Sequence, residues 1–198
     1  MKQQEFLLRL FEDNHKLCIE KNIPILRWQT FQYIVEKINN NQYQSYLEIG
    51  TAFGYSSIGI YTFCSSINKI NTIEKNNVHY LTAKSYIDQI NDPSFVIVNE
   101  DAFEYTPSST FDVILIDGPK QKQQQLITKY LPYLNQNGIM FIDNLYLKKF
   151  RNQEHKTPYM EKVLNDLNQL LIWLKNNDQF DFTLIDIDDG LGLITLRH

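Results

Sequence analysis

From residue 45 to the end of the chain, short apolar segments alternate with segments of helical periodicity, and this alternation constrains the fold most. Strands that alternate with helices form a parallel sheet with helices on both faces. Asp188-Asp189-Gly190 separates the last two apolar segments, so an antiparallel hairpin is expected at or near one sheet edge. The pattern predicts an α/β fold with strands over 45–49, 69–73, 95–98, 111–116, 138–142, 182–187 and 191–196, and helices over 55–64, 78–90, 122–134 and 157–176.

Two helices are expected before the first strand, within residues 1–40. Pro24 ends the first of them, and the second is expected over 28–39. Their apolar stripes indicate core packing or a subunit interface, and no Pro/Gly/Ser-rich linker divides the chain, so one domain over 1–198 is expected. The first stripe consists of Phe6, Leu7, Leu10, Phe11, Leu17 and Cys18, and the second of Phe31, Ile34, Val35 and Ile38.

Length, cysteine count and charge exclude several classes of protein. A chain of 198 residues can bury a core without disulfide or metal staples. Its two cysteines cannot form a disulfide framework or a cysteine-based zinc site. No signal peptide and no membrane span is evident, so a soluble cytoplasmic protein is expected. The net charge of −4 and the pI near 5.6 exclude an overall basic surface for nucleic acid but not a local one.

Acidic residues stand at the carboxyl ends of five predicted strands. Ligands of parallel α/β sheets bind beyond these ends. Solubility alone does not readily explain why five strands each place a carboxylate at the same edge of the sheet. The acidic segments are Glu48-Ile49-Gly50, Glu74, Asp101, Asp117 and Asp143-Asn144.

A glycine-rich loop, residues 50–56, follows the first predicted strand and opens a helix. It lacks the Gly-Lys-Ser/Thr ending of a P-loop, and Ala52 replaces the second glycine of the dinucleotide fingerprint. Glu48 is expected to point toward the loop, where it would repel phosphate but suit a cationic sulfonium such as that of S-adenosylmethionine (SAM). The alternative is an ordinary strand-to-helix turn.

Two further acids are in register with this loop. Glu74 is placed to accept hydrogen bonds from ribose hydroxyls, or else to favour a helix N-terminus by its charge. Asp101 and Ala102 would border the adenine, unless Asp101 only caps a short turn.

Asp117, Asp143 and Asn144 form the sharpest feature of the sequence. Two carboxylates and an amide oxygen at adjacent strand ends are hard oxygen donors that suit Mg²⁺. Lys120 follows Asp117 by three residues and can reach the same pocket. The alternatives are a capping role for Asp143 and a surface position for Lys120. The four histidines have no ligand spacing on one element.

Together these segments resemble the class I, metal-dependent O-methyltransferases of the catechol and caffeoyl-CoA type, and among them the bacterial tRNA 5-hydroxyuridine methyltransferases. The resemblance covers nearly the whole chain and implies a Rossmann-like SAM-methyltransferase fold with a seven-stranded sheet, and a homodimer. The family segments are 47–51, 54–56, 73–74, 101–102, Asp117 with Lys120, and 143–144; residues 23–26, 173–174 and 189–191 match the tRNA enzymes.

The resemblance also implies roles for individual residues. Asp117, Asp143 and Asn144 would hold the metal, and Lys120 would be the catalytic lysine. Asp117 would also approach the cofactor. The residues lining the cofactor would be Leu26, Gly50, Ser56, Glu74, Asp101 and Ala102.

The expected reaction is methylation of 5-hydroxyuridine at the tRNA wobble position. Its 5-hydroxyl and 4-carbonyl chelate a metal as a catechol does, so a small catechol-like substrate is the alternative. A non-catalytic protein that binds the cofactor or RNA is a further alternative, which the intact Asp117, Lys120, Asp143 and Asn144 disfavour. A dehydrogenase is disfavoured by Ala52 and by the metal set. Cations gather after the metal motif and could hold tRNA phosphates, or form an ordinary solvated loop: Lys148, Lys149, Arg151, Lys156 and Lys162.

Overall fold

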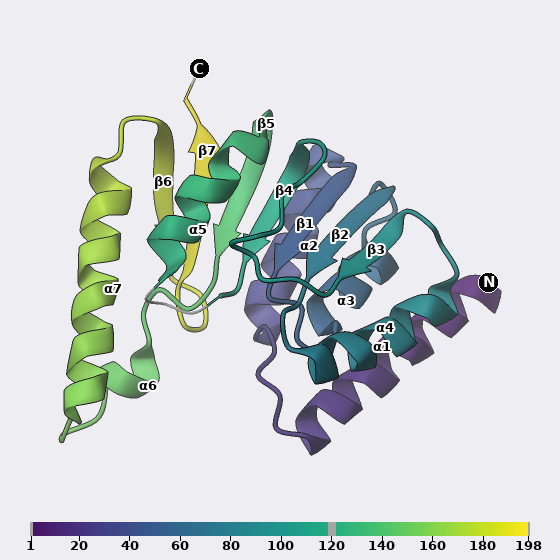
Figure 1. Ribbon diagram of the computed structural model, residues 1–198, viewed down its shortest axis with the longest axis horizontal. Helices are drawn as coiled ribbons and strands as arrows, with labels where there is room; N and C mark the ends of the chain where they lie inside the picture. The colour runs from purple at the N-terminus through teal and green to yellow at the C-terminus, as the bar shows by residue number, and fades with distance from the viewer. Residues whose placement is uncertain (1, 119–121, 198) are drawn as a thin grey trace.

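The computed structural model describes residues 2–118 and 122–197 and contains a seven-stranded sheet with the order β3-β2-β1-β4-β5-β7-β6. The first five strands pair in parallel, and β7 pairs antiparallel with β5 and with β6. The predicted architecture is confirmed, C-terminal hairpin included (Figure 1). The strands are β1 (Ser45–Ile49), β2 (Lys69–Ile73), β3 (Phe95–Val98), β4 (Phe111–Ile116), β5 (Leu134–Ile142), β6 (Phe180–Ile185) and β7 (Leu191–Leu196).

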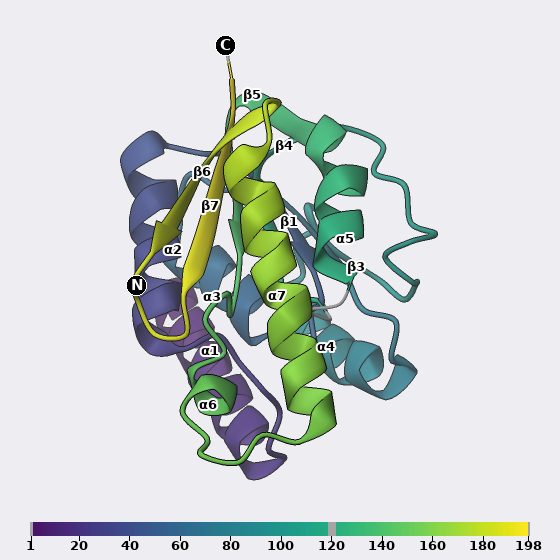
Figure 2. The same cartoon turned by 90° about the vertical axis from the view of Figure 1, so that its left-hand side faces the viewer.

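Helices cover both faces of the sheet (Figure 1, Figure 2). One apolar core lies between the sheet and α1 to α4, and a second lies between the sheet and α5 with α7. The residues of β4 from Val113 to Ile116 are fully buried because this central strand has both faces covered. The helices are α1 (Lys2–Glu20), α2 (Trp28–Asn41), α3 (Tyr55–Phe63), α4 (Asn77–Ile90), α5 (Gln123–Tyr130), α6 (Lys148–Arg151) and α7 (Pro158–Asn176), with the 3-10 turn η2 (Leu131–Tyr133) after α5.

The segment from 122 to 142 differs most from the sequence prediction. The helix expected to reach residue 134 ends at Tyr130, and a 3-10 turn that contains Pro132 follows it. β5 begins at Leu134 instead of residue 138, and its pairing with β4 shifts register between Phe111 and Val113. The shift accommodates the polar residues before Gly138, which conceal the start of the strand in the sequence.

The N-terminal helices follow the prediction, but several of their residues differ from the predicted burial pattern. Phe6 was expected in the buried stripe of α1 but is 42% exposed. Asn14, which the apolar pattern did not include, is fully buried on the same helix. Val35 on α2 is only partly buried.

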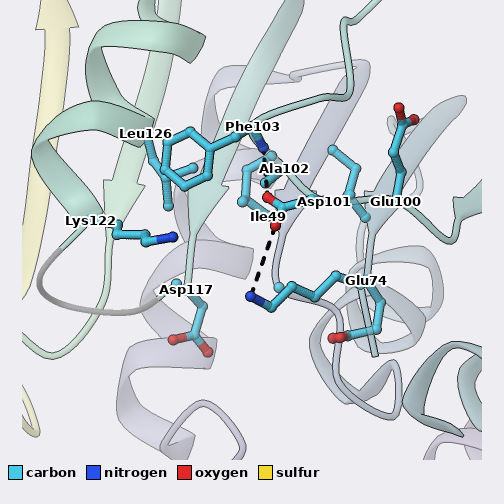
Figure 3. Close-up of a pocket in the computed structure, with 13 residues that line it drawn as sticks. Ile49, Glu74, Glu100, Asp101, Ala102, Phe103, Asp117, Lys122 and Leu126 are labelled. Carbon is cyan, nitrogen blue, oxygen red and sulfur yellow. Dashed lines mark hydrogen bonds and ion pairs between the residues drawn. The ribbon is translucent and has the colours of Figure 1, made fainter. Parts of the chain in front are cut away.

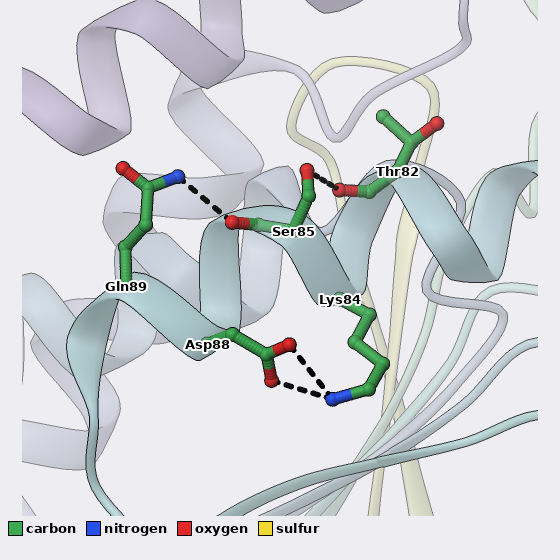
Figure 4. A network of polar contacts seen from close by, with 5 residues as sticks. All are labelled: Thr82, Lys84, Ser85, Asp88 and Gln89. Atoms are coloured by element: carbon green, nitrogen blue, oxygen red, sulfur yellow. Dashed lines mark hydrogen bonds and ion pairs between the residues drawn. The ribbon is translucent and has the colours of Figure 1, made fainter.

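The exposed surface of α4 carries polar side chains that form ion pairs and hydrogen bonds within the helix. Its Ala83 and Ile87 are buried, whereas Lys84 and Asp88 form an i,i+4 ion pair with 2.6 Å between Nζ and Oδ1 (Figure 4). The Gln89 side chain donates a hydrogen bond to the carbonyl oxygen of Ser85, and Figure 4 shows this pair across the helix from Lys84 and Asp88. Across the described residues, none of the helices has the length and apolar character needed to cross a membrane.

Candidate active site

A cavity of about 190 Å³ opens at the carboxyl ends of the parallel strands (Figure 3). Its wall comes from the ends of β1, β2 and β4 and from the turn after β3. This is the edge of the sheet at which the sequence places its acids. Among the residues that line it are Gly50, Glu74, Asp101, Ala102 and Asp117.

The glycine-rich loop depends on backbone conformations that suit glycine. Gly50 has a φ of +98° and Gly54 a φ of +93°. A Cβ atom at position 50 would overlap the carbonyl oxygen of Asp117, so only glycine lets β1 and β4 end this close together. Ala52 also has a positive φ, +48°, and its amide points toward the end of β2.

Glu74 ties this loop to β2. Its Oε2 accepts a hydrogen bond from the Ala52 amide at 2.8 Å, and its Oε1 accepts one from the Asn76 amide at 2.7 Å. The carboxylate lies at the edge of the cavity, where the sequence analysis expected a ribose-binding acid (Figure 3). It also lies two residues before Asn76, which caps α4, so both interpretations of Glu74 fit its position.

Asp101 and Ala102 form the opposite side of the cavity. Asp101 Oδ1 accepts a hydrogen bond from the Phe103 amide at 2.9 Å, which is the turn-capping role considered as the alternative. Its Oδ2 lies 3.9 Å from Lys75 Nζ across the cavity (Figure 3). The carbonyl oxygen of Ala102 accepts a hydrogen bond from the Tyr130 hydroxyl at 2.7 Å, which fixes the turn to α5.

Glu48 points toward the glycine-rich loop, as predicted, and contacts Ser56 at its end. Its carboxylate is fully buried and accepts hydrogen bonds from the hydroxyls of Ser56 and Thr72. Burial raises the pKa of Glu48 to about 7, because those hydrogen bonds only partly offset the loss of hydration. Glu48 therefore supports the glycine-rich loop from within the sheet.

A smaller recess of about 10 Å³ adjoins the cavity on the other side of Gly50. Leu26, from the segment before α2, lies in its wall together with Ser56, at the start of α3. Gly50 and Asp117 border both spaces. All the residues that the sequence analysis assigned to the cofactor are thus brought together around two neighbouring spaces.

Asp117 and Asp143 follow neighbouring strands directly. Ile116 and Ile142 are register partners in β4 and β5, and the Asp143 amide donates to the carbonyl oxygen of Ile116 at 3.3 Å. Asn144 has a φ of +61°, and its Nδ2 donates to Asp143 Oδ2 at 2.6 Å.

These three side chains provide two carboxylates and one amide oxygen, which is a donor set that suits a hard divalent cation. The described residues contain no group of three or more His, Cys, Asp or Glu side chains that could hold a metal. A metal here would therefore need the amide of Asn144 as a third donor. Lys120 lies outside the described residues.

Three neighbouring residues escaped the sequence analysis. Lys122 lines the cavity, with its Nζ 5.0 Å from the centre of the Phe103 ring (Figure 3). Gln123 is fully buried and donates to the carbonyl oxygen of Asp143 at 3.3 Å. Asn14 donates to the carbonyl oxygen of Phe53 at 2.8 Å, and its position within the apolar stripe of α1 was a signal that could have identified it.

Two of the cations that follow β5, Lys148 and Arg151, have partners within the chain. Lys148 Nζ lies 3.5 Å from Asp186 Oδ1. Arg151 donates to the carbonyl oxygen of Tyr146 at 2.7 Å and to Asn168 Oδ1 at 2.8 Å. The side chain of Lys149 lies outside the described part of the structure.

Comparison with known proteins identifies the family. Residues 4–197 match the model of a family described as O-methyltransferase. The chain belongs to this O-methyltransferase family. The predicted class of enzyme, a SAM-dependent O-methyltransferase, is thereby confirmed at the level of the family.

Solved structures share the fold of this O-methyltransferase at low sequence identity. A candidate caffeoyl-CoA O-methyltransferase from Staphylococcus aureus has a TM-score of 0.86 and 23% identity, with 100% of both chains covered. A Bacillus cereus O-methyltransferase in complex with SAH has a TM-score of 0.78 and 18% identity, covering 96% of this chain and 91% of that one.

A curated relative matches only in part. It is a candidate cobalt-precorrin-6B C(15)-methyltransferase (decarboxylating) from Thermoplasma volcanium, 25% identical over 104 residues. The match covers 52% of this chain and 52% of that protein, so the chain spans about half the length of this relative.

Proposed function

We propose that this O-methyltransferase uses SAM and a divalent cation, Mg²⁺ or a similar ion, to methylate a hydroxyl that has a second oxygen beside it. We further propose that the substrate is 5-hydroxyuridine at the tRNA wobble position. The observation that carries the proposal is the position of Asp117. It borders both cofactor spaces and stands next to Asp143 and Asn144 at the ends of adjacent strands.

The cofactor would extend through both spaces. Leu26 and Ser56 would contact its methionine part, and Glu74 and Asp101 would contact its adenosine. Enzymes of the same fold from Bacillus cereus, in complex with SAH, and from Streptomyces achromogenes, in complex with SAM, support SAM as the cofactor. Glu74 would accept hydrogen bonds from the ribose in addition to those from the loop amides.

Asp117, Asp143 and Asn144 would hold the divalent cation. Such an ion lowers the pKa of a coordinated hydroxyl and fixes the direction of its oxygen. Lys120 would accept the proton or stabilise the oxyanion, and Lys120→Ala is expected to lower turnover by about 10²- to 10⁴-fold. Methyl transfer also needs the oxygen, the methyl carbon and the sulfur in line.

A small catechol-like substrate is the second candidate, and one observation favours it. Lys148 and Arg151 are engaged by Asp186, Tyr146 and Asn168, so they offer less charge to RNA than the sequence suggests. The Staphylococcus aureus neighbour, a candidate caffeoyl-CoA O-methyltransferase, is in line with this alternative.

A direct assay separates the two substrates. Purified enzyme would be given methyl-labelled SAM with an anticodon stem-loop RNA that carries 5-hydroxyuridine, the same RNA with uridine, or a catechol. We expect label only in the RNA that carries 5-hydroxyuridine. We also expect 5-hydroxyuridine to accumulate in tRNA from cells that lack the gene. Labelling of the catechol alone would contradict the tRNA proposal.

A second experiment tests whether the cations after β5 bind RNA. Lys148→Ala with Lys149→Ala should weaken RNA binding and reduce the slope of log affinity against log salt by about 0.7 per lost phosphate contact. Arg151 is left in place because its guanidinium holds the backbone at Tyr146. Lys84→Ala is the matched control, because Lys84 is also an exposed, ion-paired lysine but lies on α4.

A further inference from the structure

The turn between β6 and β7, residues 188–190, contacts two segments that carry the proposed site. One is the start of α2, and the other is the loop that follows β5. Figure 2 shows the turn at the end of the hairpin, beside both. The sequence analysis assigned Asp188 and Asp189 only to the hairpin itself, yet both carboxylates bind residues outside it.

Asp188 caps α2 from a distant part of the chain. Its Oδ2 accepts hydrogen bonds from the Thr30 amide at 2.8 Å and the Thr30 hydroxyl at 2.9 Å. Arg27, the residue at the N-cap position of α2, makes no capping hydrogen bond through its own side chain. The segment from Pro24 to Leu26, which lines the smaller recess, enters α2 directly at this point. Asp188 therefore fixes the helix end that holds this wall.

Asp189 and Gly190 hold the loop after β5. The Asp189 carboxylate is buried, at 6% exposure, and its Oδ1 accepts from the Lys148 amide at 2.6 Å. The carbonyl oxygen of Asp189 accepts from the Tyr146 amide at 2.7 Å, and that of Gly190 accepts from the Leu145 amide at 2.8 Å. These bonds begin at the first residue after Asn144, so they fix the backbone that carries the proposed metal ligands.

We propose that Asp189 and Asp188 are separate positioning residues, the first for the metal ligands and the second for the cofactor wall. The inference rests on the proposed function, because it assigns a metal to Asp143 and Asn144. Neither carboxylate touches the reacting groups. Each acts through a hydrogen-bonded backbone segment, as outer-shell residues of metal and ligand sites do.

The test measures binding of two probes to the purified full chain by calorimetry. Mn²⁺ reports on the metal ligands, and SAH reports on the cofactor wall. Asp189→Ala is expected to raise the Kd of Mn²⁺ by about 10- to 100-fold and leave the Kd of SAH within about twofold. Asp188→Ala is expected to raise the Kd of SAH by about 2- to 30-fold, the range of a lost helix cap, and leave that of Mn²⁺ unchanged.

Three further variants make the test decisive. Asp189→Asn keeps an acceptor oxygen and should restore most of the Mn²⁺ affinity, even if Asp189→Ala folds poorly. Asp188→Asn should likewise preserve SAH binding. Asp181→Ala is the control in the same hairpin, because Asp181 pairs with Arg197 near its opposite end and should change neither affinity.

The outcomes distinguish the inference from the proposed function. If both alanine variants lost affinity for Mn²⁺ and for SAH to the same extent, the turn would have a merely structural role. This result would overturn the inference. Unchanged Mn²⁺ affinity in Asp189→Ala, with a wild type that binds Mn²⁺, would overturn the assignment of Asp189 alone. A wild type that binds SAH but no Mn²⁺ would contradict the metal in the proposed function and the role of Asp189 with it.

Discussion

The buried side chain of Asn14 donates a hydrogen bond from its Nδ2 to the carbonyl oxygen of Phe53, 2.8 Å away. Asn14 belongs to α1, and Phe53 belongs to the glycine-rich loop at the cofactor recess. The Ala52 amide in the same loop is held from the other side by Glu74. The N-terminal helix therefore helps to hold the loop, together with the contacts that the loop makes with the sheet.

Replacing Asn14 by alanine should loosen this loop. The unpaired, buried carbonyl of Phe53 should lower the free energy of unfolding by about 1–3 kcal/mol, and the Kd of SAH should rise several-fold. Chemical denaturation and calorimetry measure the two effects. The matched control is Asn39→Ala, because Asn39 also donates to a carbonyl oxygen, that of Phe63 at the far end of α3. A similar loss of SAH affinity in both variants would contradict a local role for Asn14.

Glu74→Gln should weaken cofactor binding strongly. A neutral amide accepts less well than a carboxylate from the Ala52 and Asn76 amides, and it offers less to ribose hydroxyls. The expected rise in the Kd of SAH is about 10- to 100-fold, since hydrogen bonds to charged groups contribute more than neutral ones. Glu100→Gln, in the wall of the same cavity, should leave the Kd within twofold of wild type (Figure 3). An equal effect of both variants would show that only the charge of the cavity matters.

Glu48 should make stability depend on pH between about 4.5 and 7. Its pKa rises from 4.5 to about 7 on folding, chiefly because of burial. The stabilisation from its protonated form is complete below pH 4.5 and is lost as the pH rises through 7. The loss is on the order of 3 kcal/mol, since each pKa unit corresponds to about 1.4 kcal/mol.

Denaturation of Glu48→Gln at pH 5 and pH 7.5 tests this relation. The variant cannot ionise, so its stability should fall less between the two pH values than that of the wild type. Glu104→Gln, at an exposed position, should keep the wild-type difference. If the stability of Glu48→Gln depended on pH as strongly as that of the wild type, Glu48 would be excluded as the source of the pH dependence.

Asp143→Ala should separate metal dependence from cofactor binding. Asp143 lines neither cofactor space, so SAH affinity should stay within about twofold while turnover is lost, as expected for removal of a metal ligand. A chelator should have the same effect on the wild type, and added Mg²⁺ or Mn²⁺ should reverse it. The control is Asp186→Ala, an exposed acid on the same rim that pairs with Lys148. Full turnover by the chelated wild type would contradict the proposed metal.

The strands were predictable because each contains a short run of apolar residues, which in the central strand β4 is fully buried from Val113 to Ile116. β1, β2, β3, β4 and β7 have the predicted bounds, and the hairpin lies where the turn signal of residues 188–190 placed it. β5 was predicted too short because Asn135, Gln136 and Asn137 look like a turn although they extend the strand. β6 lies two residues earlier than predicted, since the loop before β7 is longer than a tight turn.

The site was predictable only where it follows from strand ends. Parallel strands bring their last residues to one edge, so Glu74, Asp101 and Asp117 could be placed around one cavity from the sequence. The supporting contacts could not be predicted, because each joins residues that are far apart in the sequence and become neighbours only in the folded chain. Asn14 and Phe53 are 39 residues apart in the chain, and Thr30 and Asp188 are 158 apart. The complete burial of Glu48 could not be predicted for the same reason, since its partner hydroxyls come from two other elements.

The position of β7 has a consequence for synthesis of the protein. β7 lies between β5 and β6, although it follows both of them in the chain. While a ribosome is still adding residues 188–196, β5 lacks its antiparallel partner and the loop after Asn144 lacks the acceptors on Asp189 and Gly190. Domains fold as units during translation, so methyl-transfer competence should appear only after these residues have left the ribosome. Incomplete nascent chains would therefore have an incomplete sheet and no methyltransferase activity.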